Sequence, residues 1–269
     1  MEEILSLSLF EAILLGFVQG LTEFFPVSSS GHLKLIQYFL GLNNLNQYIS
    51  FDLICHLGTL SAIFAVFFKD ITSMIKSNKK LFLLLLFGNL PLLPLYPFLE
   101  ELNFFFNSPH YLGFFFLITA FLLFIGEKTK RTQTPLLENK RIWFDTFIIG
   151  IFQAIALLPG ISRSGATISI AFLLGWNRQE ATRFSFLLAI PPILGGSILE
   201  IYPLLLNPNT TYLPLEHYLA AFFISFIIGL LTLSLILHLA IKKILYPFAW
   251  YCSILGLTLL LYLNIIPNR

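Results

Sequence analysis

The sequence contains six apolar stretches that are each about as long as the 20 residues a helix needs to cross a bilayer. Hydrophobic residues make up 57% of the chain and charged residues only 11%, whereas a soluble domain carries about 25% charged residues. A soluble protein is therefore excluded. We predict an all-α polytopic membrane protein, with the lipid bilayer as its partner and six transmembrane helices at Phe51–Phe68, Leu81–Leu99, Pro109–Gly126, Phe184–Leu206, Leu215–Ile241 and Ile244–Ile266.

Two further apolar regions are interrupted in the middle by Pro, Gly and hydroxyl residues. They are Ile4–Leu42 and Phe144–Trp176, and the pieces that follow the interruptions, His32–Leu42 and Ala166–Leu174, are too short to span a bilayer. Apolar segments of about 10–14 residues are typical of re-entrant or interfacial helices. We therefore expect two re-entrant helix hairpins in addition to the six spans.

The two interrupted regions resemble each other when the chain is shifted by 134 residues. Between positions 10 and 43 this single offset aligns Phe10, Gly16, Gln19, Ser28, Ser30, Gly31, Ile36, Gly41 and Asn43 with Phe144, Gly150, Gln153, Ser162, Ser164, Gly165, Ile170, Gly175 and Asn177. The similarity predicts a single membrane domain, residues 1–269, built from repeat halves of approximately 1–126 and 144–269. Three spans separate the two hairpins, so they enter from opposite faces, as in an inverted-topology repeat.

The basic residues indicate how the chain is oriented. In this layout every Lys and Arg except Lys34, Arg163 and Arg269 lies in loops on one side, including the joining loop 127–143. The positive-inside rule makes that side cytoplasmic and places both termini outside. Because the formal net charge is only +2 and the basic residues are scattered, we expect no nucleic-acid partner.

The first hairpin carries polar side chains within an apolar segment. Gln19 and Glu23 are four residues apart and therefore share a helix face. A carboxylate in such a segment is costly and usually functional. Pro26 ends this helix, and the serines that follow can open the next helix, whose unpaired N–H groups attract anions. Ser29 and His32 lie about one turn apart at that start and can share a face.

The second hairpin places Arg163 at the position that matches Ser29, among the hydroxyl residues Ser162, Ser164 and Thr167. Arginine is the side chain best suited to bind phosphate through two nitrogens. If the tips of both hairpins meet near the membrane midplane, they form a polar pocket for an anion inside an apolar shell. A phosphate joined to a hydrophobic tail is the ligand that fits such a pocket.

Other polar residues give weaker signals. His56 and His238 lie in apolar stretches, and we expect them to be packing residues. Cys55 and Cys252 also lie in apolar stretches without the spacing of metal ligands, so we expect them to be small buried side chains.

The segments Gln19–His32 and Pro159–Thr167 resemble the two signature regions of the undecaprenyl-diphosphate phosphatase family, also known as the bacitracin-resistance family, and the resemblance extends to Phe184–Pro191. It implies a multi-pass protein of the bacterial inner membrane with an inverted-repeat fold. The implied reaction hydrolyses undecaprenyl diphosphate, a C55 polyprenyl lipid, to the monophosphate and phosphate. This recycles the lipid carrier of cell-wall synthesis, gives bacitracin resistance and takes place in a site that opens to the outer, periplasmic side.

The resemblance also implies residue roles. It implies catalytic roles for Glu23, Ser29, His32 and Arg163, and substrate binding by Gln19, Ser28, Ser30, Ser162, Ser164 and Thr167. A divalent cation, Mg²⁺ or Ca²⁺, is the expected cofactor, with Glu23 as its ligand. Many family members have Glu where this chain has Gln19, and the change weakens any scheme in which two glutamates hold the metal.

Two questions stay open at this stage. Ser29 can be a nucleophile that His32 deprotonates, or it can only bind phosphate while water attacks directly. Transport of a polyprenyl phosphate by a flippase is the alternative function, because it needs the same anion site. A serine beside a histidine favours hydrolysis, since transport needs no nucleophile. The sequence also leaves open whether the chain forms a homodimer.

Overall fold

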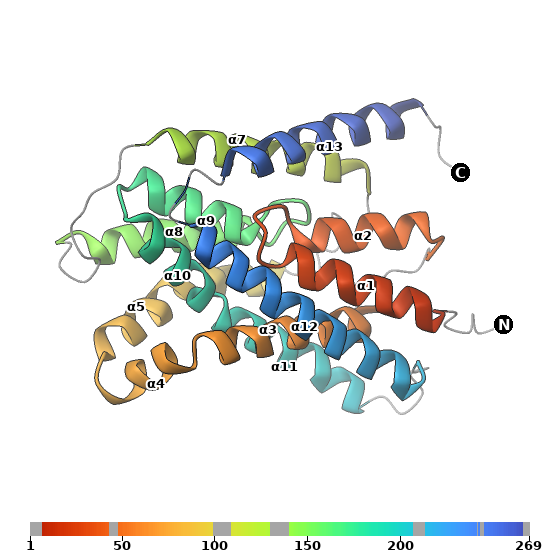
Figure 1. Cartoon of the computed structure of the whole chain (residues 1–269), viewed down its shortest axis with the longest axis horizontal. Helices are drawn as coiled ribbons and strands as arrows, with labels where there is room; N and C mark the ends of the chain where they lie inside the picture. The colour runs from red at the N-terminus through yellow and green to blue at the C-terminus, as the bar shows by residue number, and fades with distance from the viewer. Residues whose placement is uncertain are drawn as a thin grey trace.

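The computed structural model describes residues 7–42, 48–98, 109–129, 140–206, 213–240, 242 and 245–265. These residues form helices and connecting turns, and no strand occurs among them. The helices lie roughly along the long axis of the molecule (Figure 1). Many large apolar side chains on the outside are exposed, among them Phe10, Ile198, Leu215 and Leu261. An exposed apolar surface of this kind fits an integral membrane protein, whose outer face contacts lipid.

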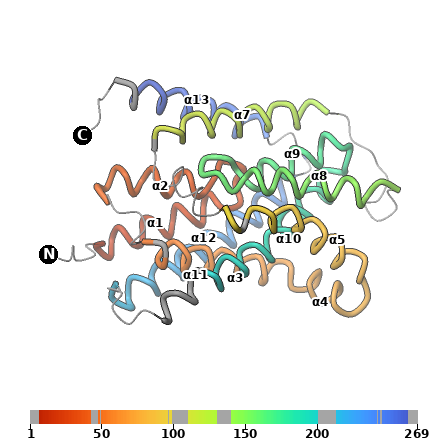
Figure 2. The backbone as a smooth tube through the Cα atoms, turned by 180° about the vertical axis from the view of Figure 1, so that it is seen from behind, coloured from red at the N-terminus to blue at the C-terminus, as the bar shows by residue number. Residues whose placement is uncertain are grey.

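Two helix–turn–helix hairpins lie where the interrupted segments predict them. The first consists of α1 (Leu9–Thr22) and α2 (Ser29–Phe39), and the second of α8 (Ile142–Ile155) and α9 (Arg163–Leu173). In each hairpin a 14-residue helix is followed by one of 11 residues. The hairpins approach from opposite ends of the molecule, and their tips lie side by side near its middle (Figures 1 and 2). The equal lengths agree with the 134-residue shift of the sequence.

The remaining helices surround these hairpins. In the first half they are α3 (Ile49–Val66), α4 (Phe68–Lys76), α5 (Lys79–Asn89), the 3₁₀ segments η2 (Leu90–Phe98) and η3 (Pro109–Tyr111), and α7 (Leu112–Lys128). In the second half they are α10 (Arg178–Leu188), α11 (Ile190–Leu206), α12 (Leu215–Leu239) and α13 (Leu245–Ile265). Helix α1 packs along α12, and α8 packs along α5 and η2. Helices α7 and α13 pair with each other at one side of the molecule (Figure 2).

Three described segments are long and apolar enough to cross a membrane: Arg178–Leu199, Leu215–Leu239 and Leu245–Tyr262. A fourth is possible if Ser50–Val66 and Phe68–Lys76, which are bent by 70° relative to each other, count as one span. The expected span at Leu81–Leu99 is broken into α5 and η2, because Pro94 and Pro97 cannot donate the hydrogen bonds of an α-helix.

The structure corrects the predicted layout in two places. The segment after Phe68, expected to be a loop, forms helix α4, which buries Met74 against the rest of the protein. The span expected to begin at Phe184 is covered by α10 and α11, and α10 begins earlier, at Arg178, because the Asn177 side chain accepts a hydrogen bond from the Gln179 N–H and caps it. Composition revealed neither α4 nor the first turns of α10, since both segments carry charged residues.

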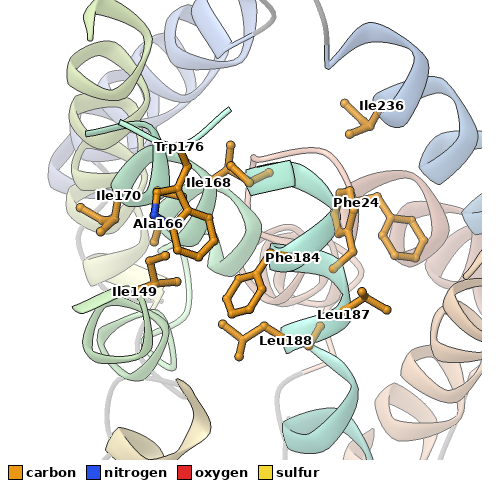
Figure 3. Close-up of a cluster of buried hydrophobic side chains, with 14 of the residues drawn as sticks. Phe24, Ile149, Ala166, Ile168, Ile170, Trp176, Phe184, Leu187, Leu188 and Ile236 are labelled. Carbon is orange, nitrogen blue, oxygen red and sulfur yellow. The ribbon is translucent and has the colours of Figure 1, made fainter. Parts of the chain in front are cut away.

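A cluster of buried apolar side chains holds the second hairpin against α10 (Figure 3). The Trp176 ring lies 5.1 Å from that of Phe184, and Trp176 Nε1 donates a hydrogen bond to Asp145 Oδ2. Phe24, next to Glu23 at the tip of the first hairpin, packs edge-on against Phe186 at 5.5 Å. Close packing of this kind restricts movement of both tips.

Candidate active site

The turn between α1 and α2 is held by Ser28. This residue has φ +71°, a left-handed conformation that is strained for any residue except glycine. Its hydroxyl accepts hydrogen bonds from the Gly31 N–H at 3.3 Å and from the Gly160 N–H of the other hairpin at 3.0 Å. The Ser28 side chain therefore caps α2 and joins the two hairpin tips at the same time.

The second hairpin uses the equivalent serine in the same way. The Ser162 hydroxyl accepts a hydrogen bond from the Gly165 N–H at 3.0 Å and caps α9. Thr119 of α7 secures this turn, because its hydroxyl accepts from the Ser162 N–H at 2.9 Å and donates to the Gly160 carbonyl at 2.8 Å. The two caps place the first turns of α2 and α9 next to the contact between the tips.

Two glycines make this contact possible. A Cβ added at Gly31 would lie 2.8 Å from a ring atom of Phe116 and 2.9 Å from the Gly160 Cα. Gly160 has φ +97°, and a Cβ there would lie 2.8 Å from the Phe115 side chain. A larger residue at Gly31 would push the hairpins apart, and one at Gly160 would push the tip of the second hairpin away from α7.

Glu23 lies at the centre of the polar side chains that the tips bring together. Its Oε1 accepts from Arg163 Nη2 at 2.5 Å, and its Oε2 accepts from the Ser29 hydroxyl at 2.6 Å and from Gln19 Nε2 at 2.9 Å. The Glu23 carboxylate is buried. A charge in such a place needs a partner of opposite charge, and Arg163 supplies it.

Arg163 has hydrogen-bonding capacity left over. Its Nη1 atom is buried and has no hydrogen-bond partner among the residues that the structure describes. A buried donor without a partner is costly, so such atoms commonly mark a place that a ligand fills. Because guanidinium binds phosphate oxygens well, this atom points to an anionic ligand beside Glu23.

A cavity of about 270 Å³ opens at these side chains. Glu23, Ser29 and Arg163 line it together with Ser28, Ser30, Ser162 and Ser164, and helices α3 and α11 form its opposite wall. The cavity therefore has a polar end at the hairpin tips. It combines a cation, a carboxylate, hydroxyl groups and two helix N-termini, which are groups that bind and transform phosphate esters or anhydrides.

The chain is similar to proteins of a known family. The family model described as "Bacitracin resistance protein BacA" matches residues 12–258. The chain belongs to this family. It is 45% identical over 258 residues to the undecaprenyl-diphosphatase of Protochlamydia amoebophila, with 95% of this chain and 99% of that protein covered. It is 39% identical to the undecaprenyl-diphosphatase of Carboxydothermus hydrogenoformans, with 93% of this chain and 96% of that protein covered.

Of the catalytic residues that the BacA-family resemblance implies, His32 lies apart from the other three. Its Nδ1 is 2.7 Å from the Ser28 carbonyl oxygen and its Nε2 is 2.7 Å from the Tyr251 hydroxyl. A carbonyl only accepts, so Nδ1 carries the proton and Nε2 accepts from Tyr251. Both ring nitrogens are therefore engaged away from Ser29, and the group in contact with the Ser29 hydroxyl is Glu23.

The expected substrate-binding residues divide into two sets. Ser30 and Ser164 line the cavity, each with its hydroxyl 3.3–3.4 Å from the capping serine of its own hairpin. Thr167 is buried elsewhere, where its hydroxyl lies 2.6 Å from that of Ser185 and donates to the Arg163 carbonyl at 2.8 Å. Thr167 thus connects α9 to α10, and it is not among the described residues that line the cavity.

His56 also belongs to the site, although its sequence surroundings predicted a packing residue. Its Nδ1 lies 2.7 Å from Gln19 Nε2 and 3.5 Å from Glu23 Oε2, and the ring lines the cavity. The signal that could have identified His56 is a titratable side chain in the middle of an apolar span, and the same kind of signal identified Glu23. Cys55 and Cys252 are buried and free, as expected.

The donor set around Glu23 limits how a metal ion can bind. Both carboxylate oxygens accept from protein donors, and Gln19 turns its amide nitrogen, not its oxygen, toward them. Among the described residues no group of three His, Cys, Asp or Glu side chains could hold a metal ion. These residues do not make a protein cage for a cation. A cation here would need phosphate oxygens for most of its ligands, with Glu23 as a single carboxylate ligand, an arrangement that Mg²⁺ commonly has.

Proposed function

We propose that this protein is an undecaprenyl-diphosphatase, a membrane hydrolase that removes the terminal phosphate of a C55 polyprenyl diphosphate. The observation that carries the proposal is the hydrogen bond of 2.6 Å from the Ser29 hydroxyl to Glu23 Oε2, in a cavity that Arg163 also lines. Membership of the BacA family and the names of the relatives support it. The product monophosphate is the lipid carrier of cell-wall synthesis.

In the proposed reaction the diphosphate lies between the first turns of α2 and α9. Arg163 Nη1 and the free N–H groups of the two helix starts bind the non-bridging oxygens of the terminal phosphate. The Ser29 oxygen attacks the terminal phosphorus while its proton moves to Glu23. The bond from phosphorus to the bridging oxygen breaks, and the polyprenyl monophosphate leaves. Water then hydrolyses the phosphoserine, giving inorganic phosphate and restoring Ser29.

A direct route competes with this one. Water attacks the terminal phosphorus while Glu23 accepts its proton, and Ser29 only binds a phosphate oxygen. Both routes place Glu23 as the base, because it is the proton acceptor in contact with Ser29. In either route His32 is a positioning residue that holds the Ser28 turn through its carbonyl.

The structure favours hydrolysis over lipid transport. A flippase needs an anion site and a path across the membrane, but no hydroxyl held against a buried carboxylate. Ser29 and Glu23 form such a pair of nucleophile and base. The site also lies where close packing fixes both hairpin tips, whereas a path that opens alternately to each side needs movement of the repeats.

A divalent cation is part of the proposal. It would be held mainly by the diphosphate, with Glu23 as a protein ligand, and would neutralise charge on the phosphate oxygens. Chelation with EDTA should then lower the rate of phosphate release, and added Mg²⁺ or Ca²⁺ should restore it. A rate unchanged by thorough chelation would contradict a role for the cation.

We also propose six spans in an inverted-topology repeat, with the site open to the periplasmic side of the inner membrane. The approach of the hairpins from opposite ends supports this layout (Figure 1). The helix packing supports it as well. Helix α1 packs along α12, and α8 packs along α5 and η2. The 134-residue shift turns one of these packing arrangements into the other, because it takes α1 to α8 and the segment of α5 and η2 to α12. Helix α11 lines the cavity and runs toward the end of the molecule where α1 begins (Figure 1), which is the end that the positive-inside rule places outside. Labelling of single cysteines at positions 100–108 and 128–141 from the same side would contradict it.

The direct test is phosphate release by the purified protein in detergent, with undecaprenyl diphosphate as substrate. We expect multiple turnovers that yield one phosphate and one monophosphate per substrate. The same protein in liposomes should show no net movement of a fluorescent polyprenyl phosphate between leaflets. Movement of the lipid without phosphate release would show that the protein is a flippase and not a hydrolase.

A further inference from the structure

The cavity at the hairpin tips continues into an apolar part that the proposed chemistry does not use. Away from Glu23 it is lined by Leu53 of α3, Leu157 at the end of α8, and Ile193 and Gly196 of α11, with the hydroxyl residue Ser197 beside them. A second cavity of about 370 Å³ lies against it, and Leu157 lines both. The second cavity is formed by Pro91 and Leu95 of η2 and by Ile151, Ala154, Ile155, Leu157 and Leu158.

We propose that these two cavities form one binding site for the polyprenyl chain of the substrate. The first isoprene units lie beside Ile193 and Gly196, and the next units pass Leu157 into the space between η2 and α8. The proposal rests on the proposed function, because it takes a lipid diphosphate as the molecule whose head group lies at Arg163. It assigns a place to the part of the substrate that the hairpin tips do not contact.

Helix α11 leaves room for a chain at this point. A Cβ added at Gly196 would meet no atom within 4 Å, so the helix presents open space to the cavity instead of a side chain. Gly195 also has open space around it, but it does not line the cavity. The pair therefore offers two adjacent positions in one helix, of which only one faces the proposed path.

The segment η2 forms the far wall because of its prolines. Pro94 and Pro97 lie inside it and keep it in a 3₁₀ conformation next to the end of α8. Ile155 on α8 lines the second cavity and is 43% exposed, so an apolar side chain borders this cavity on the lipid-facing surface. A chain that enters at Leu157 can therefore continue into the bilayer between η2 and α8.

The chemistry of the lining favours a hydrocarbon chain as the occupant. Every residue that lines the second cavity is apolar, whereas the polar side chains line the first cavity, at the hairpin tips and at His56 of α3 and Ser197 of α11. This division matches a molecule with a charged head and an apolar tail. Lipid is as apolar as leucine, so the tail gains little from leaving the bilayer, and fit to the cavity decides which chains bind.

The activity test compares Gly196→Leu with Gly195→Leu on two substrates, undecaprenyl diphosphate and methyl diphosphate, which has no isoprene unit. We expect Gly196→Leu to lower kcat/KM for the C55 substrate roughly tenfold or more, because a leucine side chain fills the path. Its kcat/KM for methyl diphosphate should fall much less than its kcat/KM for the C55 substrate, and Gly195→Leu should change neither value by more than about twofold. Equal losses on both substrates, an equal loss in Gly195→Leu, or no loss in Gly196→Leu would each overturn the proposal.

A second readout needs no turnover. An undecaprenyl diphosphate analogue with a diazirine in its third isoprene unit should label residues 90–98 or 151–158 in the native protein, as located by peptide mass spectrometry. Excess undecaprenyl diphosphate should suppress the labelling, and excess phospholipid should not. Labelling of other residues, or suppression by phospholipid that equals suppression by undecaprenyl diphosphate, would overturn the tail site. If the protein labels as expected but releases no phosphate, the hydrolase proposal fails and the tail site stands.

Discussion

Arg163 Nη2 lies 2.5 Å from Glu23 Oε1, although the two residues are 140 positions apart and belong to different hairpins. This ion pair joins the two halves of the chain and aligns the carboxylate that receives the Ser29 hydrogen bond. Removing one partner of such a buried pair typically costs about 3–5 kcal/mol, because the other charge is left buried without compensation. The same contact therefore supports the fold and, in the proposed reaction, the chemistry.

Arg163→Lys should lower kcat by about 10²–10³-fold. Lysine keeps the charge, but it loses the planar fork that lets one nitrogen bind Glu23 while the other is left for the phosphate of the proposed reaction. Phosphate release from undecaprenyl diphosphate in detergent measures the effect, and gel filtration checks that the variant stays folded. Turnover close to that of the native protein would show that the second nitrogen binds no phosphate.

His32 offers a test of positioning against proton transfer. His32→Asn can still donate to the Ser28 carbonyl, as the native Nδ1 does, whereas His32→Ala cannot. If the ring only holds the turn, the Asn variant should keep activity within about tenfold of the native value with an unchanged pH–rate profile. The Ala variant should lose more. Equal inactivation of both, with loss of one limb of the pH profile, would make His32 the base after all.

Much of this arrangement follows from local sequence signals. The equivalent caps at Ser28 and Ser162 lie where the 134-residue shift places them, and the interruption by Pro and Gly predicts both hairpins. Glu23 and Arg163 are recognisable because a charged side chain in an apolar segment is energetically costly and is usually functional. These features depend on neighbours a few residues away, which a sequence displays.

The contacts that the sequence did not reveal join distant segments. The partner of His32 is Tyr251, 219 positions later, and nothing around either residue indicates the pairing. His56 joins the site only because α3 passes beside Gln19. Thr167 repeats the hydroxyl pattern of the tip but turns to Ser185 on α10. In each case the tertiary packing of another helix decides the role.

Gly31→Ala should separate the hairpin tips. The added Cβ would lie within 3 Å of both Phe116 and Gly160, so the tips must move, and overpacking of this kind typically costs about 1–3 kcal/mol. We expect a lower thermal unfolding temperature in detergent together with a loss of activity. Gly195→Ala is the matched control, because an added Cβ there meets no atom within 4 Å. A Gly31→Ala variant as stable and active as this control would contradict the proposed contact.

Ser29→Ala separates the covalent from the direct route. If Ser29 is the nucleophile, the variant should have no measurable turnover, and the native protein quenched in acid should contain phosphoserine at position 29. If Ser29 only binds phosphate, a few per cent of the activity should remain, about the loss expected from one hydrogen-bond donor. Residual turnover without any trapped phosphoserine would establish direct attack by water.

The most direct test of the central claim is the rate of phosphate release by Glu23→Gln. Glutamine has nearly the shape of glutamate, so it can still contact Arg163 and Ser29, but it accepts no proton and carries no charge. If Glu23 is the base of the reaction, we expect the rate with undecaprenyl diphosphate to fall by at least about 10²-fold while the protein stays folded. A folded Glu23→Gln variant that releases phosphate at the native rate would contradict the account.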